Sequence, residues 1–242
     1  MGIIKHEIPI LEFDTEKTAV INLKLPLKCV FAFLGEYIDE YAKNSETRQV
    51  ETFISATKQY PIYVTKYMDT DICLCQAPVG AAAAAQLMDF LIGYGVKEII
   101  SAGSCGVLED FPESTFLVPY KALRDEGTSY HYAPPSRFID IDEKARKAIE
   151  KTILEHKMNY LEIITWSTKE KVAYRKEEGC STVEMECSAL AACARLRDVI
   201  WGMILYTADS LADAEAYDPR NWGGNACEYA LKLCLDAVLK IG

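Results

Sequence analysis

The sequence predicts an α/β protein that is built around a mostly buried β-sheet. Short apolar runs rich in Val, Ile, Phe and Tyr alternate along the chain with longer segments of helical period, as expected for strands connected by helices. Some runs are apolar at nearly every position, as in ICLCQA (72–77) and VIWGMILYT (199–207). Strands lose their alternation of apolar and polar residues when both faces of the sheet are covered. We therefore expect helices on both sides of the sheet.

The individual elements follow from the same patterns. The predicted strands cover residues 29–34, 61–67, 72–77, 98–102, 115–120, 160–165 and 199–207. The predicted helices cover residues 81–95, 141–157, 187–197 and 225–241. The second helix begins with Asp142 and Glu143, whose negative charge suits a helix N-terminus.

Length and composition limit the possible classes of protein. The chain has 242 residues, half of them hydrophobic, and contains no linker-like, low-complexity or repeated segment, so a single domain over 1–242 is expected. The formal net charge of -10, with no cluster of Lys and Arg, argues against binding to a nucleic-acid backbone. A small neutral or anionic substrate would instead need a locally positive pocket.

The cysteines and the apolar segments indicate a cytoplasmic protein. The nine cysteines are scattered and odd in number, and the three histidines show no zinc-site spacing, so we expect reduced core thiols and no metal. The N-terminal segment MGIIKHEIPILEFD is interrupted by charges and a proline, unlike a signal peptide. No run approaches the ~18 apolar residues that a membrane span requires.

Ligand sites of open α/β sheets lie beyond the carboxyl ends of strands, so a binding site is expected at these ends. AGSCGVLED follows the predicted strand 98–102, and its glycines allow a sharp turn and close approach of a ligand to backbone N–H groups. Ser104 adds a hydroxyl donor. This segment is either an anion cradle or an ordinary turn at the end of a strand.

A carboxyl group follows the last predicted strand. Asp209 lies immediately beyond 199–207, where an acid can donate a proton to a leaving group, and Arg220 follows eleven positions later, where it could fold back onto Asp209. Asp209 is otherwise a loop residue or a helix N-cap.

Two more carboxyl groups lie in an otherwise apolar stretch, GCSTVEMECSALAACAR (179–195). Buried carboxylates require compensation. Glu184 and Glu186 fall where a strand ends and a helix begins, so Glu186 is expected to stay ionised near a helix N-terminus. An ionised carboxylate can accept two hydrogen bonds from one vicinal diol, as in a sugar. The alternative is a capping glutamate without a ligand.

The segment KALRDEGTSYHYAPPSRF (121–138) mixes charged, aromatic, Gly and Pro residues and is predicted to be an ordered loop. Such loops are often functional or lie at subunit contacts. His131 within it is a candidate ligand contact or a packed interface residue.

Together these segments resemble the nucleoside phosphorylase superfamily, which includes purine nucleoside phosphorylase, uridine phosphorylase and the methylthioadenosine nucleosidases. VEMECSAL resembles its V-E-M-E motif, EIISAGSCGVL its Gly-Ser/Thr-Cys/Ala-Gly turn, and YTADSL its T-x-S-D stretch. RDEGTSYHYAPP is similar to a segment of uridine phosphorylases. The matches occur in family order over residues 28–240, the expected core of the domain.

The resemblance implies a mixed sheet curled into a distorted barrel with helices around it. It also implies a homo-oligomer, either a dimer or a trimer of dimers, in which neighbours complete each other's sites. The implied reaction cleaves the N-glycosidic bond of a nucleoside with phosphate to give free base and ribose 1-phosphate. Asp209 favours a purine base. Phosphate is a co-substrate, and no metal or organic cofactor is required.

The resemblance also assigns roles to residues on the sugar and on the base. Glu186 would bind the ribose 2′- and 3′-hydroxyls, Met185 would pack against the sugar, and Glu184 would support this site. Asp209 would assist the departing purine at N7, and Arg220 would position Asp209.

Phosphate and base contacts are implied in the same way. Ser104 would contact the phosphate, with Gly35 in the N-terminal phosphate loop and Arg48 supplied by a neighbouring subunit. Cys105 and Gly106 would line the base pocket.

The chain departs from the family at three places. Ser101 stands where the family has an arginine before the Gly-Ser turn, and Asp39 occupies the arginine position of the phosphate loop, which reverses the charge. The segment after Thr168 is short and lacks the usual base-stacking aromatic, unless Trp166 or Tyr174 replaces it. The alternatives are therefore a nucleosidase that uses water and a nucleoside-binding protein without catalysis.

Overall fold

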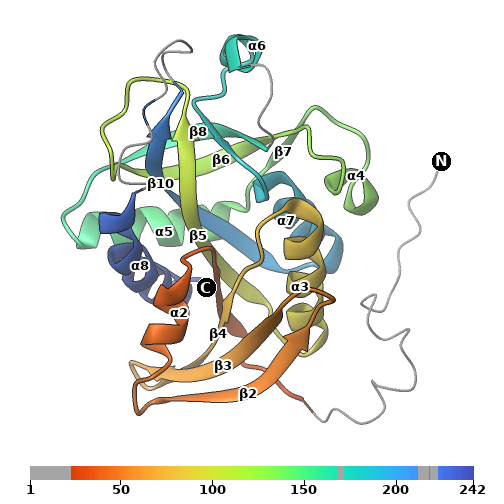
Figure 1. The fold of residues 1–242 in the computed structure, drawn as a ribbon, viewed down its shortest axis with the longest axis vertical. Coiled ribbons are helices and arrows are strands. Elements are labelled where there is room, and N and C mark those ends of the chain that lie inside the picture. Colours follow the sequence, from red (N-terminus) through yellow and green to blue (C-terminus); the bar gives the residue numbers. More distant parts are fainter. Residues whose placement is uncertain (1–22, 168–171, 212–217, 219–222) are drawn as a thin grey trace.

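The structure is a computed structural model that describes residues 23–167, 172–211, 218 and 223–242 (Figure 1). Its strands are β1 (Lys28–Ala32), β2 (Thr47–Ile54), β3 (Gln59–Tyr67), β4 (Thr70–Gln76), β5 (Glu98–Val107), β6 (Phe116–Arg124), β7 (Phe138–Asp140), β8 (Tyr160–Ser167), β9 (Thr182–Glu184) and β10 (Ile200–Ser210). Its helices are α2 (Glu36–Tyr41), α3 (Ala81–Gly93), α4 (Ser129–Tyr132), α5 (Glu143–Glu155), α6 (Val172–Glu177), α7 (Cys187–Arg197), α8 (Cys227–Leu239) and the short 3-10 helix η2 (Gly224–Ala226).

The strands form one mixed sheet that closes on itself at one end. In the ring β5–β10–β6–β8–β9, each strand pairs with the next, and β9 pairs again with β5. β1, β4, β3 and β2 continue from β5 as an open extension, and β7 pairs with β6 outside this order. β1, β4, β5 and β10 run parallel to one another, whereas β6 runs antiparallel to β10 and β9 antiparallel to β5. This arrangement confirms the predicted distorted barrel.

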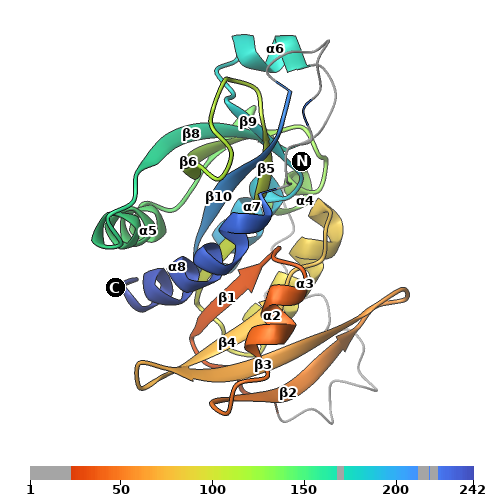
Figure 2. The ribbon, with the colours of Figure 1, turned by 60° about the vertical axis from the view of Figure 1, so that its left-hand side comes forward.

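Helices cover the sheet on two sides, as the continuous apolar strands predicted (Figure 1, Figure 2). α3 and α7 pack on one side, and α5 and α8 pack on the other. β4 shows the consequence. Cys73 and Cys75 belong to the core cluster under α3 and α7, whereas Ile72 and Leu74 belong to the cluster under α5 and α8. All four side chains are fully buried.

Every predicted strand and helix is present, with ends that differ by a few residues. The helix over 187–197 has the predicted bounds, and the predicted N-terminus of α5 is confirmed because the Asp142 carboxylate accepts hydrogen bonds from two amides of its first turn. The prediction missed β2, β7 and the short helices α2, α4 and α6. β2 is a partly exposed edge strand with polar residues at several positions, so its sequence carries no strand-like period.

Among the strands that extend farther than predicted, β5 and β10 concern the candidate site. β5 continues through Gly103–Val107, so GSCG lies within a strand and is not a turn. β10 continues through Ser210, so Asp209 belongs to the sheet rather than to a loop. β5 extends because both of its edges are paired there. Cys105 is opposite Thr207 of β10, and Gly106 is opposite Val183 of β9.

The segment 121–138 was also only partly a loop. β6 extends to Arg124, and α4 forms one turn inside the segment. Arg124 is buried because its guanidinium donates to the Ser129 hydroxyl at 2.9 Å, to the Ser136 hydroxyl at 2.8 Å and to two backbone carbonyls. The Arg124 guanidinium thus holds this segment together. His131 lies exposed on α4.

All nine cysteines lie in the described part of the chain, where each is buried and unbridged, as predicted for core thiols. In the described ranges, no helix combines the length and the apolar character that a membrane crossing requires.

Candidate functional site

Three buried carboxyl groups come from segments that meet at the end of the barrel. Glu184 ends β9, Glu186 begins α7, and Asp209 lies near the end of β10, and each is 6% exposed. The Cys105 thiol of β5 lies beside two of them. Burial raises the pKa of Cys105 well above its usual value, and the negative charges of Glu184 and Asp209 raise the pKa further. The predicted sugar-binding and base-binding residues are therefore brought together.

Glu186 occupies the N-cap position of α7, yet its carboxylate points to another helix. Oε1 accepts a hydrogen bond of 2.6 Å from the N–H of Gly80, the residue before α3. Gly80 has φ 104°, a conformation that side chains rarely adopt. Burial raises the pKa of Glu186, whereas the hydrogen bonds from the backbone N–H groups at Gly80 and Met185 oppose this shift. Apart from these two backbone N–H groups, no described residue donates a hydrogen bond to the Glu186 carboxylate.

Both oxygens of the Glu184 carboxyl group are occupied by protein donors. Oε1 accepts from the Ser167 hydroxyl, and Oε2 accepts from the N–H groups of Glu186 and Cys187, each at 2.6 Å. Burial raises the pKa of Glu184 to about 7, and repulsion from Glu186 adds to this effect, while the hydrogen bonds oppose it. The carboxyl group thus holds the first turn of α7.

Asp209 lies on an irregularity of β10. Thr207 is opposite Cys105, but Ser210 is opposite Val107, so β10 carries one extra residue in this interval. Such a bulge redirects a side chain at the end of a strand. Here it brings Asp209 Oδ1 to 3.2 Å from the point where a Cβ atom on Gly106 would lie. Within the described ranges, the Asp209 carboxyl group receives no hydrogen bond.

Gly106 provides space beside the Asp209 carboxyl group, whereas Ser104 offers a hydroxyl group. A Cβ atom at Gly106 would lie 3.1 Å from Val183 Cγ1 and 3.2 Å from Asp209 Oδ1, closer than side chains normally pack, so a glycine lets β5 pass close to the carboxyl group. Ser104 is exposed, so its hydroxyl is accessible to a ligand. The Cys105 thiol is buried and lies 3.5 Å from the carbonyl oxygen of Tyr206.

The predicted phosphate residues are only partly brought together. The Phe33 N–H donates to the Ala102 carbonyl at 2.7 Å, so the end of β1 that leads to Gly35 lies beside the part of β5 that carries Ser104. Gly35 has φ 58° and open space where a side chain would begin. Arg48 is exposed on β2, which β1, β4 and β3 separate from β5. Within one chain, Arg48 is on the far edge of the sheet.

Neither of the two substituted arginine positions supplies a cation. Ser101 is fully buried and accepts a 3.0 Å hydrogen bond from the indole of Trp201. Asp39 is exposed on α2 and accepts a 2.9 Å hydrogen bond from the Tyr63 hydroxyl. Arg220 lies outside the described residues, so its predicted proximity to Asp209 stays a prediction.

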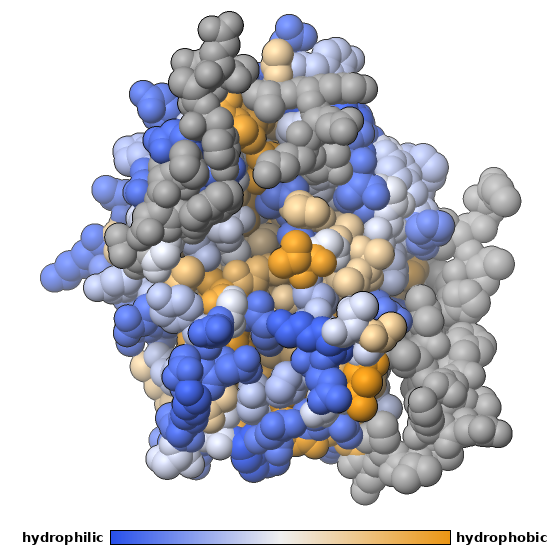
Figure 3. Space-filling view, in the orientation of Figure 1, coloured by the Kyte–Doolittle hydropathy of each residue, from blue (hydrophilic) through white to orange (hydrophobic). Residues whose placement is uncertain are grey.

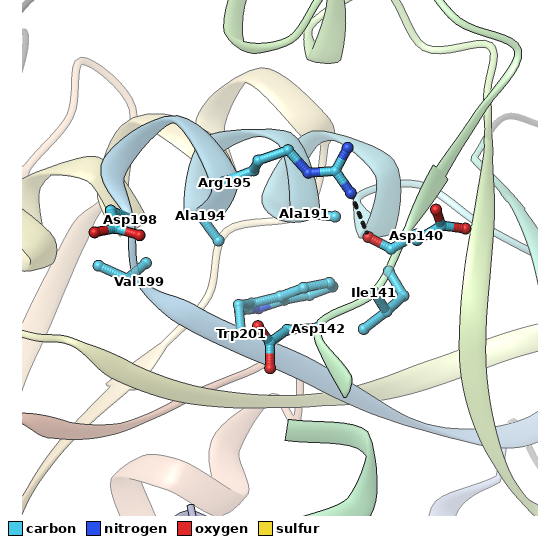
Figure 4. Close-up of a pocket in the computed structure, with 9 residues that line it drawn as sticks. All are labelled: Asp140, Ile141, Asp142, Ala191, Ala194, Arg195, Asp198, Val199 and Trp201. Atoms are coloured by element: carbon cyan, nitrogen blue, oxygen red, sulfur yellow. Dashed lines mark hydrogen bonds between the residues drawn. The ribbon is translucent and has the colours of Figure 1, made fainter. Parts of the chain in front are cut away.

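Trp201 also forms the floor of a pocket of about 230 Å³ at the carboxyl end of α7 (Figure 4). Arg195 extends across this pocket and donates to the carbonyl oxygen of Asp140 at 3.0 Å. The pocket is at the opposite end of α7 from Glu186 and is lined by none of the predicted site residues.

The two candidate base-stacking aromatics differ in accessibility. Trp166 is fully buried in a small core cluster, and its indole donates to Asp125 at 3.2 Å. Its ring is therefore unavailable for stacking. Tyr174 is 58% exposed on α6 and lies 5.3 Å from the guanidinium of Arg175. Thr168, where the shortened segment begins, is outside the described residues.

Two residues of the site, Gly80 and Ser167, were missed by sequence reasoning. Gly80 donates to Glu186 from 106 residues away in the chain, and Ser167 donates to Glu184 from 17 residues away. Met185, between the two glutamates, is 49% exposed. Figure 3 shows that apolar side chains gather in the middle of the face of the molecule that is drawn there. The local signal for Gly80 was a glycine directly before the predicted helix 81–95.

The chain is similar in sequence to known proteins. A family model described as the phosphorylase superfamily matches residues 28–240. The guanosine phosphorylase of Halorubrum lacusprofundi is 30% identical over 80 residues, a segment that covers 33% of each chain. The match therefore spans about a third of the length of that relative.

Two solved structures share the fold. Purine nucleoside phosphorylase from Toxoplasma gondii, in complex with immucillin-H, superposes with a TM-score of 0.76 at 17% identity, covering 90% of this chain and 92% of that one. AMP nucleosidase from Bacteroides thetaiotaomicron gives 0.71 at 22% identity, covering 89% and 88%. Proteins named for phosphorolysis and for hydrolysis thus have the same architecture.

Proposed function

Because this chain belongs to the phosphorylase superfamily, we propose that it cleaves the N-glycosidic bond of a purine nucleoside and transfers the ribosyl group to phosphate. The products are the free base and ribose 1-phosphate. One observation carries the proposal. Glu186 and Asp209 are both buried at the end of the barrel. Among the described residues, only backbone N–H groups donate to the Glu186 carboxylate, and none donates to the Asp209 carboxyl group. The local similarity to a guanosine phosphorylase supports a purine base.

Glu186 acts on the sugar. Cleavage of the bond develops positive, oxocarbenium-like charge on the ribose, and a nearby anion stabilises that charge. Oε1 is held by Gly80, so Oε2 and the remaining lone pairs accept the 2′- and 3′-hydroxyls. The half-exposed Met185 side chain packs against the pentose.

Asp209 acts on the base. The leaving purine gains negative charge as the bond breaks, and a carboxylic acid beside N7 donates a proton or a hydrogen bond to it. The β10 bulge and the missing side chain at Gly106 leave space for the carboxyl group beside β5. Arg220 positions this carboxyl group, and Cys105 lines the base pocket with Gly106.

Phosphate enters on the side of Ser104 and Gly35. Arg48 supplies positive charge from a neighbouring subunit of a homo-oligomer, because within its own chain it is on the far edge of the sheet. We further propose that the enzyme works in the cytoplasm without metal or organic cofactor.

A second candidate function, hydrolysis of the same bond, is favoured by Ser101 and Asp39. Both stand at positions where the family resemblance implies phosphate-binding arginines, and both are engaged by protein hydrogen bonds. A site without these cations binds an anionic nucleophile more weakly, which favours water.

The test is a panel of purine and pyrimidine nucleosides assayed with and without phosphate. Phosphate-dependent release of purine base with ribose 1-phosphate supports phosphorolysis. Equal rates without phosphate would establish hydrolysis, and binding without turnover across the panel would identify a nucleoside-binding protein.

Glu186→Gln tests the sugar contact. We expect kcat/KM to fall about 10- to 100-fold, because one charged hydrogen-bond acceptor is lost. Unchanged kinetics would remove Glu186 from the site.

Asp209→Asn tests proton donation. We expect purine nucleosides to lose about 10²–10⁴-fold in kcat, whereas substrates with activated leaving groups lose much less. Equal losses for both kinds of substrate would argue against an acid at this position.

A further inference from the structure

The first turn of α7 is capped in an unusual way. An N-cap side chain normally accepts a hydrogen bond from an N–H group two or three residues later. Asp142 of α5 does so, because its carboxylate accepts from the N–H groups of Lys144 at 2.8 Å and Ala145 at 3.1 Å. Glu186 holds the same position in α7 but makes no such bond. Its carboxylate accepts from Gly80 instead.

Two other residues take over the capping of α7. Glu184 Oε2 accepts from the N–H groups of Glu186 and Cys187, both at 2.6 Å. The Ser167 hydroxyl oxygen accepts from the N–H of Ser188 at 3.2 Å and donates to Glu184 Oε1 at 2.6 Å. The Ser188 N–H is one of the two donors from which Glu186 would normally accept, and it is already bonded to Ser167.

We propose that Ser167 and Glu184 are positioning residues that cap α7 in place of Glu186 and thereby leave the Glu186 carboxylate at Gly80, where it meets the ligand. The identity of the ligand rests on the proposed function, but the position of the carboxylate does not. Neither positioning residue touches the substrate. Ser167 is fully buried at the end of β8, and both oxygens of Glu184 are occupied.

Two sets of N–H donors compete for the Glu186 carboxylate. The Gly80 N–H and the first N–H groups of α7 are helix-terminal donors that have no acceptor within their own helix, so both attract a carboxylate. Without the Ser167 hydroxyl, the Ser188 N–H is left without an acceptor in a buried place. Glu186 is the adjacent acceptor that can turn back to satisfy it, and it would then leave Gly80.

The experiment measures the Gly80 amide directly in the full-length protein. In Ser167→Ala we expect hydrogen exchange at the Gly80 N–H to accelerate about tenfold, because its acceptor has moved. Asp142→Ala is the matched control, since it removes a cap from α5 and should leave Gly80 exchange as in the wild type. Ser167→Cys keeps the side-chain volume with a weaker acceptor and should shift exchange in the same direction.

Unchanged Gly80 exchange in both Ser167 variants would overturn the proposal. So would equal acceleration in Asp142→Ala, since the effect would then be general loosening.

Kinetics provide a second and separable measurement. We expect Ser167→Ala to raise the KM for the nucleoside about tenfold with a smaller effect on kcat, and to have no further effect in a Glu186→Gln background. Additive effects of the two substitutions would contradict action through Glu186. If the wild type cleaves no nucleoside, the proposed function fails, whereas Gly80 exchange still decides whether Ser167 positions the carboxylate.

Discussion

Glu184 makes the stability of this protein depend on pH in the opposite sense to most carboxyl groups. Burial raises its pKa from 4.5 to about 7. The folded state therefore holds this proton more tightly than the unfolded state does. Protonated Glu184 therefore contributes its full stabilisation of the folded state below about pH 4.5, and this stabilisation is lost as the pH rises through about 7. Because the group is buried, the shift corresponds to about 3 kcal/mol at full ionisation.

Glu184→Gln removes this titration while keeping the side-chain volume and a carbonyl acceptor for the first turn of α7. We expect the free energy of unfolding of the variant, relative to the wild type, to rise by up to about 3 kcal/mol between pH 5 and pH 8. Glu186→Gln should give a smaller pH dependence than the wild type, because repulsion from Glu186 contributes to the raised pKa of Glu184.

Urea unfolding between pH 5 and pH 8 measures these differences, with Glu228→Gln at an exposed position of α8 as the matched control. The control should follow the wild type across the range. A constant difference between wild type and Glu184→Gln at every pH would refute the reasoning, because Glu184 would then have the same pKa in the folded and unfolded states.

Two further predictions concern packing and are measured by the same unfolding assay. Gly202→Ala should lower the free energy of unfolding by about 1–3 kcal/mol, because the new Cβ would lie 2.7 Å from Cβ of Ala145 and 3.2 Å from Cδ1 of Ile149 on α5. A variant with wild-type stability would contradict this prediction, since α5 would then move away at no cost. Arg197→Met should cost about 3–5 kcal/mol, because it removes the guanidinium that pairs with both oxygens of the buried Asp89 at 2.5 and 2.8 Å. Adding Asp89→Asn to Arg197→Met should restore part of this loss, and a further loss would contradict a charge effect.

The elements that could be predicted are those whose signal is local. β4 reads as a strand covered on both faces because four successive apolar residues, Ile72–Cys75, face two different helical layers. The bounds of α7 follow from an apolar run that begins after Glu186 and contains no helix breaker. The resemblance of the V-E-M-E and GSCG segments to a known family likewise identified which residues to expect at the site.

The arrangement of the site depends on partners that are distant in the chain, and no local pattern encodes them. Gly80 and Glu186 are 106 residues apart, and Ser167 meets Glu184 only because β8 and β9 pair in that register. GSCG becomes a strand because β9 and β10 bond to both of its edges, and Asp209 turns beside it because β10 gains one residue there. Residue type and periodicity thus specify which segments are buried and which side chains carry charge. Only the closing of the barrel determines which donor each carboxylate meets, because a hydrogen bond depends on the relative position of two atoms and not on either residue alone.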